Sequence, residues 1–162
     1  MAAPGAGRDG RNPALAGVFE RILVLCVGNL CRSPMAAAIL DDALKRCRCP
    51  RTVRSAGVAA VAGAPADALA CRCMAERGLD LSNHRATALR PYLVRQADLV
   101  LVMEEAQRRW LIEAEPAAAG KTYLLGHWTG VEIADPYLQP AAAYEEAIRL
   151  IDAAVAEWVE RL

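Results

Sequence analysis

The sequence predicts an α/β fold, in which a single doubly wound parallel sheet of four strands carries helices on both faces. Short apolar runs alternate along the chain with segments in which apolar residues recur every three or four positions, as strands alternating with amphipathic helices do. This alternation is typical of right-handed βαβ units. The run at residues 21–27 is almost continuously apolar, as expected of a parallel strand that is covered on both sides.

The remaining elements follow from the same two patterns. The other strands are expected at residues 52–55, 98–103 and 122–125. Helices are expected at residues 34–46, 65–77, 90–97, 104–114 and 140–162. Gly78 directly follows the second helix and is a residue type that commonly ends one. The last helix carries an apolar face made of Tyr144, Ile148, Ile151, Val155, Trp158 and Val159.

Length and composition indicate one soluble domain at residues 19–162. The chain has 162 residues, of which 55% are hydrophobic, and it shows neither an internal repeat nor a linker. Residues 1–18 are rich in Ala, Gly, Pro and Arg and are expected to form a disordered arm. Pro4, Arg8 and Pro13 interrupt any secretory apolar region there, and no run is long enough to span a membrane. We therefore expect a cytoplasmic protein.

Charge and cysteine content exclude several partners. The formal net charge is zero, so neither nucleic acid nor an anionic membrane is expected as a main partner. Two Cys-x-Cys pairs could suggest zinc: Cys47 with Cys49, and Cys71 with Cys73. Structural zinc sites usually have two to four residues within each pair, and both pairs fall in helix-like contexts. We expect incidental cysteines, and neither a metal nor an organic cofactor.

The most informative feature is a cysteine followed after five residues by an arginine, between the first strand and the first helix. Cys26 and Arg32 frame a loop whose backbone N–H groups can point at one tetrahedral dianion. The following helix adds its positive end, and an arginine can bind two oxygens of the anion. The same groups favour the thiolate of Cys26, which is the nucleophilic form. Gly28 and Asn29 are residue types that tolerate positive φ, and Pro34 suits a helix start.

A Cys-x5-Arg pair also arises by chance, but further motifs support a functional reading. The loop resembles the signature loop of the low-molecular-weight protein tyrosine phosphatases. The same resemblance extends in order over Ser55-Ala56-Gly57, residues 80–86, residues 98–104 and Asp135-Pro136-Tyr137. It covers residues 20–162 and is closest to the bacterial branch, whose members are paired with tyrosine autokinases in exopolysaccharide export. It implies the strand order 2-1-3-4.

The resemblance also implies the roles of the site residues. The phosphate would bind to Val27, Gly28, Asn29, Leu30, Cys31, Arg32 and Ser33. Asp135 would be the general acid, although Glu104 and Glu105 reach the same edge of the sheet. Tyr137 would flank a substrate ring. Asn29, Ser55 and His84 would support the loop, with His84 in a structural role. Ser33 would bind the thiolate, or it could cap the helix.

The predicted activity is hydrolysis of protein phosphotyrosine through a cysteinyl-phosphate intermediate, with a tyrosine autokinase as the implied partner. A protein-arginine phosphatase is the nearest alternative. In those relatives the fourth residue after the nucleophile resembles threonine, whereas this chain has the apolar Leu30 there. An arsenate reductase would need resolving cysteines near Val102-Met103-Glu104. A non-catalytic phosphate-binding module would not need to keep Cys26, Arg32 and Asp135 together. Cys31 lies five residues from Cys26, and we predict a reversible disulfide between them under peroxide.

Overall fold

One parallel sheet of four strands organises the protein, which is described here from a computed structural model covering residues 18–162. The strands are β1 (Arg21–Cys26), β2 (Thr52–Gly57), β3 (Leu99–Val102) and β4 (Thr122–Leu124). Their order in the sheet is β2-β1-β3-β4, and every pairing is parallel. The predicted fold class and strand order are therefore confirmed. The predicted disordered arm at residues 1–18 lies, except for Val18, outside the described residues.

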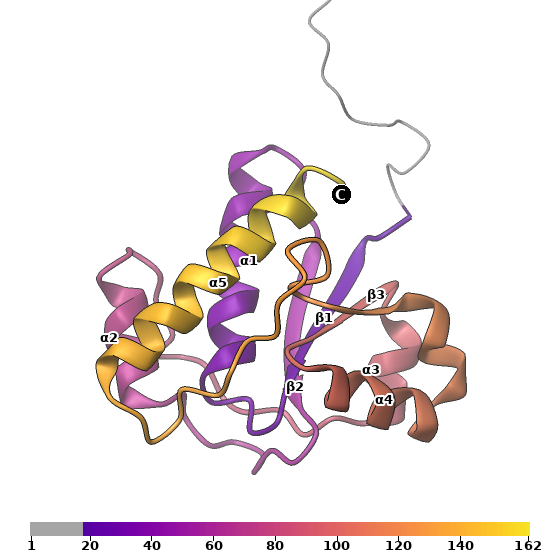
Figure 1. Cartoon of the computed structure of the whole chain (residues 1–162), viewed down its shortest axis with the longest axis horizontal. Helices are drawn as coiled ribbons and strands as arrows, with labels where there is room; N and C mark the ends of the chain where they lie inside the picture. Colours follow the sequence, from indigo (N-terminus) through magenta and orange to yellow (C-terminus); the bar gives the residue numbers. More distant parts are fainter. Residues whose placement is uncertain (1–17) are drawn as a thin grey trace, which may run out of the picture.

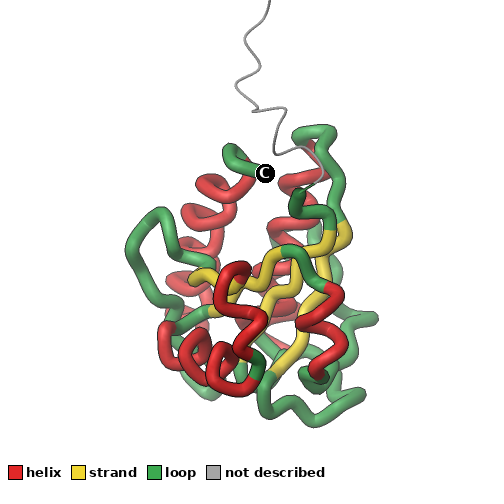
Figure 2. The backbone as a smooth tube through the Cα atoms, turned by 90° about the vertical axis from the view of Figure 1, so that its right-hand side faces the viewer, coloured by secondary structure: helices red, strands yellow, loops and turns green. Residues whose placement is uncertain are grey.

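Helices cover the two faces of the sheet (Figure 1 and Figure 2). On one face lie α1 (Arg32–Arg46), α2 (Ala68–Ala75) and α5 (Ala141–Val159), and α1 packs along α5. On the other face lie α3 (Pro91–Gln96), α4 (Glu105–Ala114) and the 3-10 helix η1 (Pro116–Lys121). No helix within residues 18–162 is both long and apolar enough to cross a lipid bilayer.

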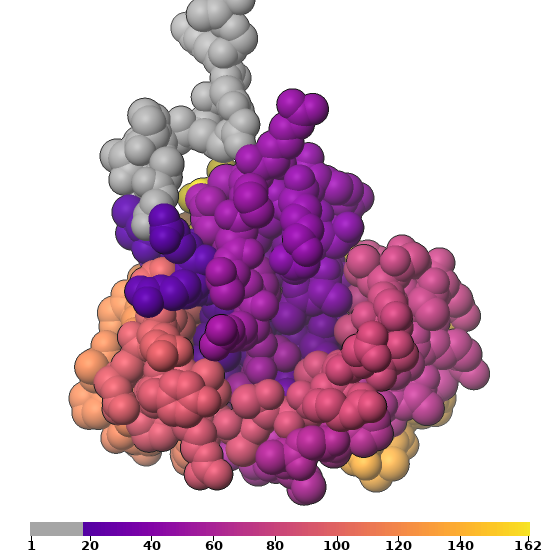
Figure 3. Space-filling model, turned by 180° about the vertical axis from the view of Figure 1, so that it is seen from behind, coloured from indigo at the N-terminus to yellow at the C-terminus, as the bar shows by residue number. Residues whose placement is uncertain are grey.

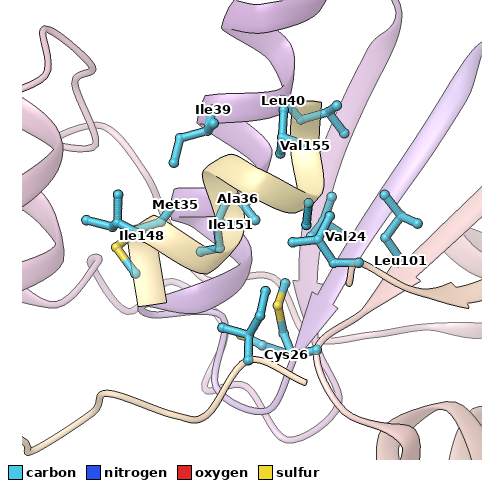
Figure 4. Packing of buried hydrophobic residues seen from close by; sticks show 14 of the residues in the cluster. Val24, Cys26, Met35, Ala36, Ile39, Leu40, Leu101, Ile148, Ile151 and Val155 are labelled. Atoms are coloured by element: carbon cyan, nitrogen blue, oxygen red, sulfur yellow. The ribbon is translucent and has the colours of Figure 1, made fainter. Parts of the chain in front are cut away.

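The larger core lies between the sheet and the α1–α5 pair (Figure 4). Val24 and Leu101 of the sheet face Met35 and Ile39 of α1 and Ile151 of α5 there. The predicted apolar face of α5 is buried, except that Val159 is only partly covered. Burial of side chains of this size stabilises the fold by roughly 1.5–3 kcal/mol each. Cys26 lies at the lower edge of this core, at the carboxyl end of β1.

Two predicted helix starts are wrong. Helix α1 begins at Arg32, two residues before the expected start, so Pro34 occupies its first turn, where its missing N–H leaves no bond unmade. Helix α2 begins only at Ala68, because the Asp67 carboxylate caps it by accepting hydrogen bonds from two backbone N–H groups. Pro65 instead forms an isolated bridge with the backbone of Arg85.

Two further differences concern short segments. Helix η1 was not predicted, since its Ala-rich sequence carries no apolar periodicity. Cys47 and Cys49 were expected in a helix-like context, but they follow the end of α1, where Cys47 is the C-cap residue. Cys71 and Cys73 do lie in a helix, α2.

Candidate active site

The loop between β1 and α1 forms the floor of a pocket of about 180 Å³ at the carboxyl ends of the strands. The pocket is lined by Cys26, Val27, Gly28, Leu30, Cys31, Arg32, Asp135 and Tyr137. Ligands of open parallel sheets commonly bind at this edge, where the strand order reverses. The reversal occurs here beside β1, because the chain runs from β1 to β2 on one side and then crosses back to β3 on the other side of β1.

The tight curl of the β1–α1 loop depends on one left-handed residue in the loop and on a glycine in the neighbouring strand β2. Asn29 adopts a left-handed conformation with φ of 54°, as predicted, whereas Gly28 does not have a positive φ, and that prediction is wrong. A Cβ atom at Gly28 would make only ordinary contacts, so nothing in the backbone requires glycine there. Gly57 is different: a Cβ atom there would lie 2.5 Å from the Val27 carbonyl oxygen and 2.9 Å from the Asn29 nitrogen. The loop therefore passes β2 only because this residue is glycine.

The Cys26 sulfur is buried at the base of the pocket and has two hydrogen-bond neighbours. Its Sγ atom lies 2.9 Å from the Ser33 hydroxyl and 3.3 Å from the Asn29 backbone N–H, which donates to it. The Cys26 side chain lies at the carboxyl end of β1 and just before the amino terminus of α1. Donors of this kind stabilise a negative charge on sulfur. The geometry favours Cys26 as a nucleophile.

The buried side chain of Asn29 connects the loop to two other segments. Its amide nitrogen donates to the hydroxyls of Ser33 at 2.8 Å and Ser55 at 2.9 Å. Its amide oxygen accepts from the Thr87 N–H at 2.8 Å, and its backbone oxygen lies 2.8 Å from His84 Nε2. These contacts agree with the supporting network predicted for Asn29, Ser55 and His84. Residues 84–87 thus hold the loop from behind.

The Arg32 guanidinium is almost fully buried and is held from three sides. It donates to the Ile133 backbone oxygen at 2.8 Å and pairs with the Glu104 carboxylate. A second nitrogen lies 3.4 Å from Asp135 Oδ2. Two carboxylates and a carbonyl therefore fix the plane of the guanidinium beside the pocket. A fixed, planar cation is suited to binding two oxygens of a phosphate.

The two acidic residues beside Arg32 differ in their access to the pocket and in their other contacts. Asp135 lines the pocket, is half exposed and is followed by Pro136 in the loop before α5. Its Oδ1 atom accepts a hydrogen bond from the Tyr137 N–H at 3.1 Å. Glu104 does not line the pocket, and it forms a capping box with Gln107 at the start of α4. This arrangement favours Asp135 over Glu104 as the proton donor. Glu105 pairs with Arg108 instead.

Apolar side chains surround the mouth of the pocket. Val27 and Tyr137, which line the pocket, are 41% and 43% exposed. Leu30 and Tyr137 both line the pocket. A flat apolar group that enters toward Cys26 would therefore contact apolar surface on its way.

A buried network behind the loop was not foreseen from the sequence. The Cys31 thiol lies 3.7 Å from the Tyr144 hydroxyl of α5, which donates to the Asp67 carboxylate at 2.8 Å. Burial, first of all, raises the pKa of Cys31 to about 12, and burial together with Asp67 raises the pKa of Tyr144. Cys31 is therefore a neutral thiol at ordinary pH. Cys26 and Cys31 are not joined by a disulfide in the structure, and the predicted bond between them under peroxide stays a prediction.

The structure brings all the residues predicted for the site together at one edge of the sheet. Three residues that support the site were not predicted for it: Thr87, Asp67 and Tyr144. The pairing of Glu104 with Arg32 was not predicted either. Only Asp67 carried a usable signal, since aspartate is a good helix N-cap. Within residues 18–162, no three His, Cys, Asp or Glu side chains are grouped as a metal ion would require.

Comparisons with known proteins agree with this geometry. The model of the low molecular weight phosphotyrosine protein phosphatase family matches residues 21–162. EpsP of Ralstonia nicotianae, a probable low molecular weight protein-tyrosine-phosphatase, is 43% identical over 145 residues, which are 90% of this chain and 97% of EpsP. Vibrio vulnificus Wzb, solved in complex with benzylphosphonate, is 42% identical with a TM-score of 0.83, covering 89% of this chain and 99% of Wzb. The YwlE arginine phosphatase from Geobacillus stearothermophilus is 33% identical with a TM-score of 0.79, covering 87% of this chain and 91% of YwlE.

Proposed function

The chain belongs to the low molecular weight phosphotyrosine protein phosphatase family, and from this premise we propose that it hydrolyses protein phosphotyrosine through a cysteinyl-phosphate intermediate. One observation carries the proposal: the Cys26 sulfur, the Arg32 guanidinium and the Asp135 carboxyl line the same small pocket. A nucleophile, an anion-binding group and a proton donor are the three parts that this reaction needs.

In the first step, the Cys26 thiolate attacks phosphorus and the bond between phosphorus and the phenolic oxygen breaks. Arg32 and the loop N–H groups bind the other phosphoryl oxygens, on which charge accumulates. The bound dianion takes over the Arg32 nitrogen that otherwise faces Asp135. Asp135, as the general acid, gives a proton to the leaving oxygen, and tyrosine departs.

In the second step, water attacks the phosphorus of the cysteinyl phosphate. Asp135, which is now a carboxylate, accepts the proton from this water. The sulfur leaves as a thiolate, stabilised by the Ser33 hydroxyl and the Asn29 N–H. Inorganic phosphate is released, and Asp135 is again protonated. Both steps use only side chains that are already placed at the pocket.

The substrate is proposed to be phosphotyrosine rather than phosphoarginine. Leu30 and Tyr137 line the pocket and offer apolar surface to a phenyl ring. The guanidinium of a phosphoarginine would need hydrogen-bond acceptors once it lost water, and the Leu30 side chain has none. The arginine phosphatase reading remains the alternative, because the arginine phosphatase YwlE is similar to this chain over most of its length.

We further propose a bacterial tyrosine autokinase of polysaccharide export as the protein partner. The sequence resembles the bacterial branch of the family, whose members are paired with such kinases. The similarity to Wzb and EpsP supports this branch. A cytoplasmic location is proposed on the same grounds.

The decisive experiment compares the wild type with Cys26→Ser and with Cys71→Ser, a matched control in α2. The assay measures phosphate release from phosphotyrosine, phosphoserine and phosphoarginine peptides. We expect Cys26→Ser to be inactive while it still binds vanadate, and Cys71→Ser to keep wild-type activity. Mass spectrometry of acid-quenched wild type should place phosphate on Cys26. Activity in Cys26→Ser would disprove the mechanism, and faster hydrolysis of phosphoarginine would disprove the substrate.

A further inference from the structure

One strand of the sheet is left without a helix on the face that carries α3, α4 and η1. Strands β1 and β3 each contribute two buried side chains to the core on that face, whereas β2 contributes only Ala56. Side chains alternate along a strand, so Thr52 and Arg54 lie on the same face as Ala56, and both are exposed. Seen from behind, the molecule is hollowed in its middle, between the pink and the coral parts of the surface (Figure 3).

This hollow is a continuous trough. It consists of two cavities of about 260 Å³ and 380 Å³ that share Leu23, Arg54 and Leu93. Arg21 lines the first cavity, near the amino end of the strands, and Arg85 lines the second, near the carboxyl end. The two shared leucines lie at the bottom of the trough, since both are nearly fully buried. The floor of the trough is therefore apolar.

The charged side chains that line the trough are all basic. Its described lining contains three arginines and no carboxylate. Arg21 is paired with Asp98, at 2.9 Å, and Arg85 donates to backbone carbonyls, including that of His84, at 2.7 Å. The central Arg54 guanidinium has neither an ion pair nor a hydrogen bond to any residue within 18–162. It is therefore available to an anionic partner.

The shape of the trough favours an extended peptide over a small anion. Arg21 lines only the first cavity, Arg85 lines only the second and Arg54 lines both, so the three arginines are spread along the trough. β2 has six residues, which at about 3.3 Å per residue spans roughly 20 Å. It is also an edge strand of the sheet, which is where extended peptides commonly bind proteins. Carboxylates on such a peptide would reach the arginines, and an apolar residue would reach the floor.

The carboxyl end of the trough touches the back of the catalytic loop. Ser55, His84 and Thr87 line it, and these are the residues that hold Asn29. The pocket that contains Cys26 shares none of its lining residues with the trough. A peptide in the trough would therefore leave the catalytic pocket open.

We propose that this trough is a docking site for an acidic, extended segment of a protein partner, with Arg54 as its central contact. The proposal does not depend on the substrate of the catalytic pocket. It requires only that a partner present carboxylates in an extended chain with one apolar residue among them. Binding of this kind is weakened by salt, because it depends on exposed charges.

The test uses the full chain and a fluorescein-labelled hexapeptide of Glu and Asp residues with one central leucine. Fluorescence anisotropy is measured with the active site saturated with vanadate. We expect binding that vanadate does not displace, and that Arg54→Glu weakens about tenfold or more. Arg72→Glu, at an exposed arginine of α2 on the other face, is the matched control and should bind like the wild type.

Arg54→Glu should also retain wild-type hydrolysis of a small aryl phosphate, which shows that it is folded. Equal weakening by Arg54→Glu and Arg72→Glu would overturn the proposal, and so would absence of binding or displacement by vanadate. A uridine oligonucleotide of the same length that bound as tightly would show a nonspecific polyanion surface instead. Tighter binding of free phosphate or a nucleotide at Arg54 would equally rule out the peptide.

Discussion

The side-chain amide of Asn29 donates a hydrogen bond to the Ser33 hydroxyl at 2.8 Å. This contact decides where the single proton of Ser33 points. The amide of Asn29 must present its nitrogen to Ser33, because its oxygen accepts from the Thr87 N–H. The Ser33 hydroxyl therefore donates elsewhere, and its nearest acceptor is the Cys26 sulfur, at 2.9 Å, with the Ala56 carbonyl farther away, at 3.5 Å. Asn29 thus orients Ser33 toward the nucleophile.

Ser33→Ala should lower kcat by about 10–100-fold, because it removes a hydrogen bond to a charged sulfur that is worth roughly 1.5–3 kcal/mol. The variant should fold normally, since the serine contributes little apolar surface. Steady-state hydrolysis of an aryl phosphate measures the effect. Ser82→Ala, at an exposed loop position, serves as the control. An unchanged kcat in Ser33→Ala would show that the hydroxyl does not serve the thiolate.

Asn29 combines a left-handed backbone with a buried hydrogen-bonding side chain, and two substitutions separate these roles. Asn29→Gly keeps the backbone conformation but loses the side-chain bonds, so the free energy of unfolding should fall by about 1–3 kcal/mol. Asn29→Ala loses the same bonds but keeps a Cβ at positive φ without the polar side chain that makes this conformation tolerable, so it should be roughly 1–2 kcal/mol less stable than Asn29→Gly. Urea denaturation measures both variants. If Asn29→Ala were the more stable of the two, the left-handed conformation would carry no strain.

The sequence was sufficient to predict the sheet and the loop, because both depend on local patterns. The apolar run at Arg21–Cys26 and the spacing from Cys26 to Arg32 can be read directly from the chain. Helix boundaries were less accurate, because capping decides them. Asp67 begins α2 through two backbone hydrogen bonds that apolar periodicity does not reveal.

Contacts between distant segments could not be predicted from residue patterns. Glu104 was weighed as a proton donor, and its pairing with Arg32, 72 residues away, was not predicted. Tyr144 was assigned to an apolar face, although its hydroxyl binds Asp67. Arg54 could not be placed over an uncovered strand until the positions of α3 and α4 were known. Each of these depends on how helices pack, which one sequence does not specify.

The choice of general acid is tested by comparing Asp135→Asn with Glu104→Gln. Asp135→Asn should slow the hydrolysis of phosphotyrosine by about 10²–10⁴-fold. Cleavage of aryl phosphates with acidic leaving groups should be affected less in the first step, because such groups leave without a proton. Glu104→Gln should act mainly by loosening Arg32, so it should raise KM for phosphate esters. A larger loss of kcat in Glu104→Gln would reverse the assignment.

Cys31 should make the protein less stable at alkaline pH. Burial raises the pKa of its thiol to about 12 in the folded chain, against about 8.5 when unfolded. Above about pH 8.5 the unfolded chain loses a proton that the folded chain retains, so deprotonation favours unfolding. The stabilisation is fully present below about pH 8.5 and is lost as the pH rises toward 12, by up to roughly 1.4 kcal/mol per pH unit.

Cys31→Ser removes this titration, and the free energy of unfolding in urea at several alkaline pH values reveals it. The advantage of the wild type over Cys31→Ser should shrink steadily as the pH rises above about 8.5. Cys47→Ser, at an exposed cysteine, should follow the wild-type pH dependence. A constant difference between the wild type and Cys31→Ser would show that the folded thiol ionises as readily as the unfolded one.

Leu30 offers the most specific test of substrate choice. It lines the catalytic pocket together with Tyr137, where a phenyl ring loses water against apolar surface. Leu30→Thr exchanges part of that surface for a hydroxyl that can accept a hydrogen bond from a guanidinium. The ratio of kcat/KM for phosphotyrosine over phosphoarginine peptides should therefore fall, by roughly tenfold or more, since one mismatched polar or apolar contact is worth about 1–3 kcal/mol. Leu138→Asn, at an exposed position that does not line the pocket, controls for a general loss of apolar surface, and asparagine tolerates the positive φ of this residue. This variant should leave the ratio unchanged. An equal fall in both variants, or a wild type that already prefers phosphoarginine, would mean that Leu30 does not select the substrate.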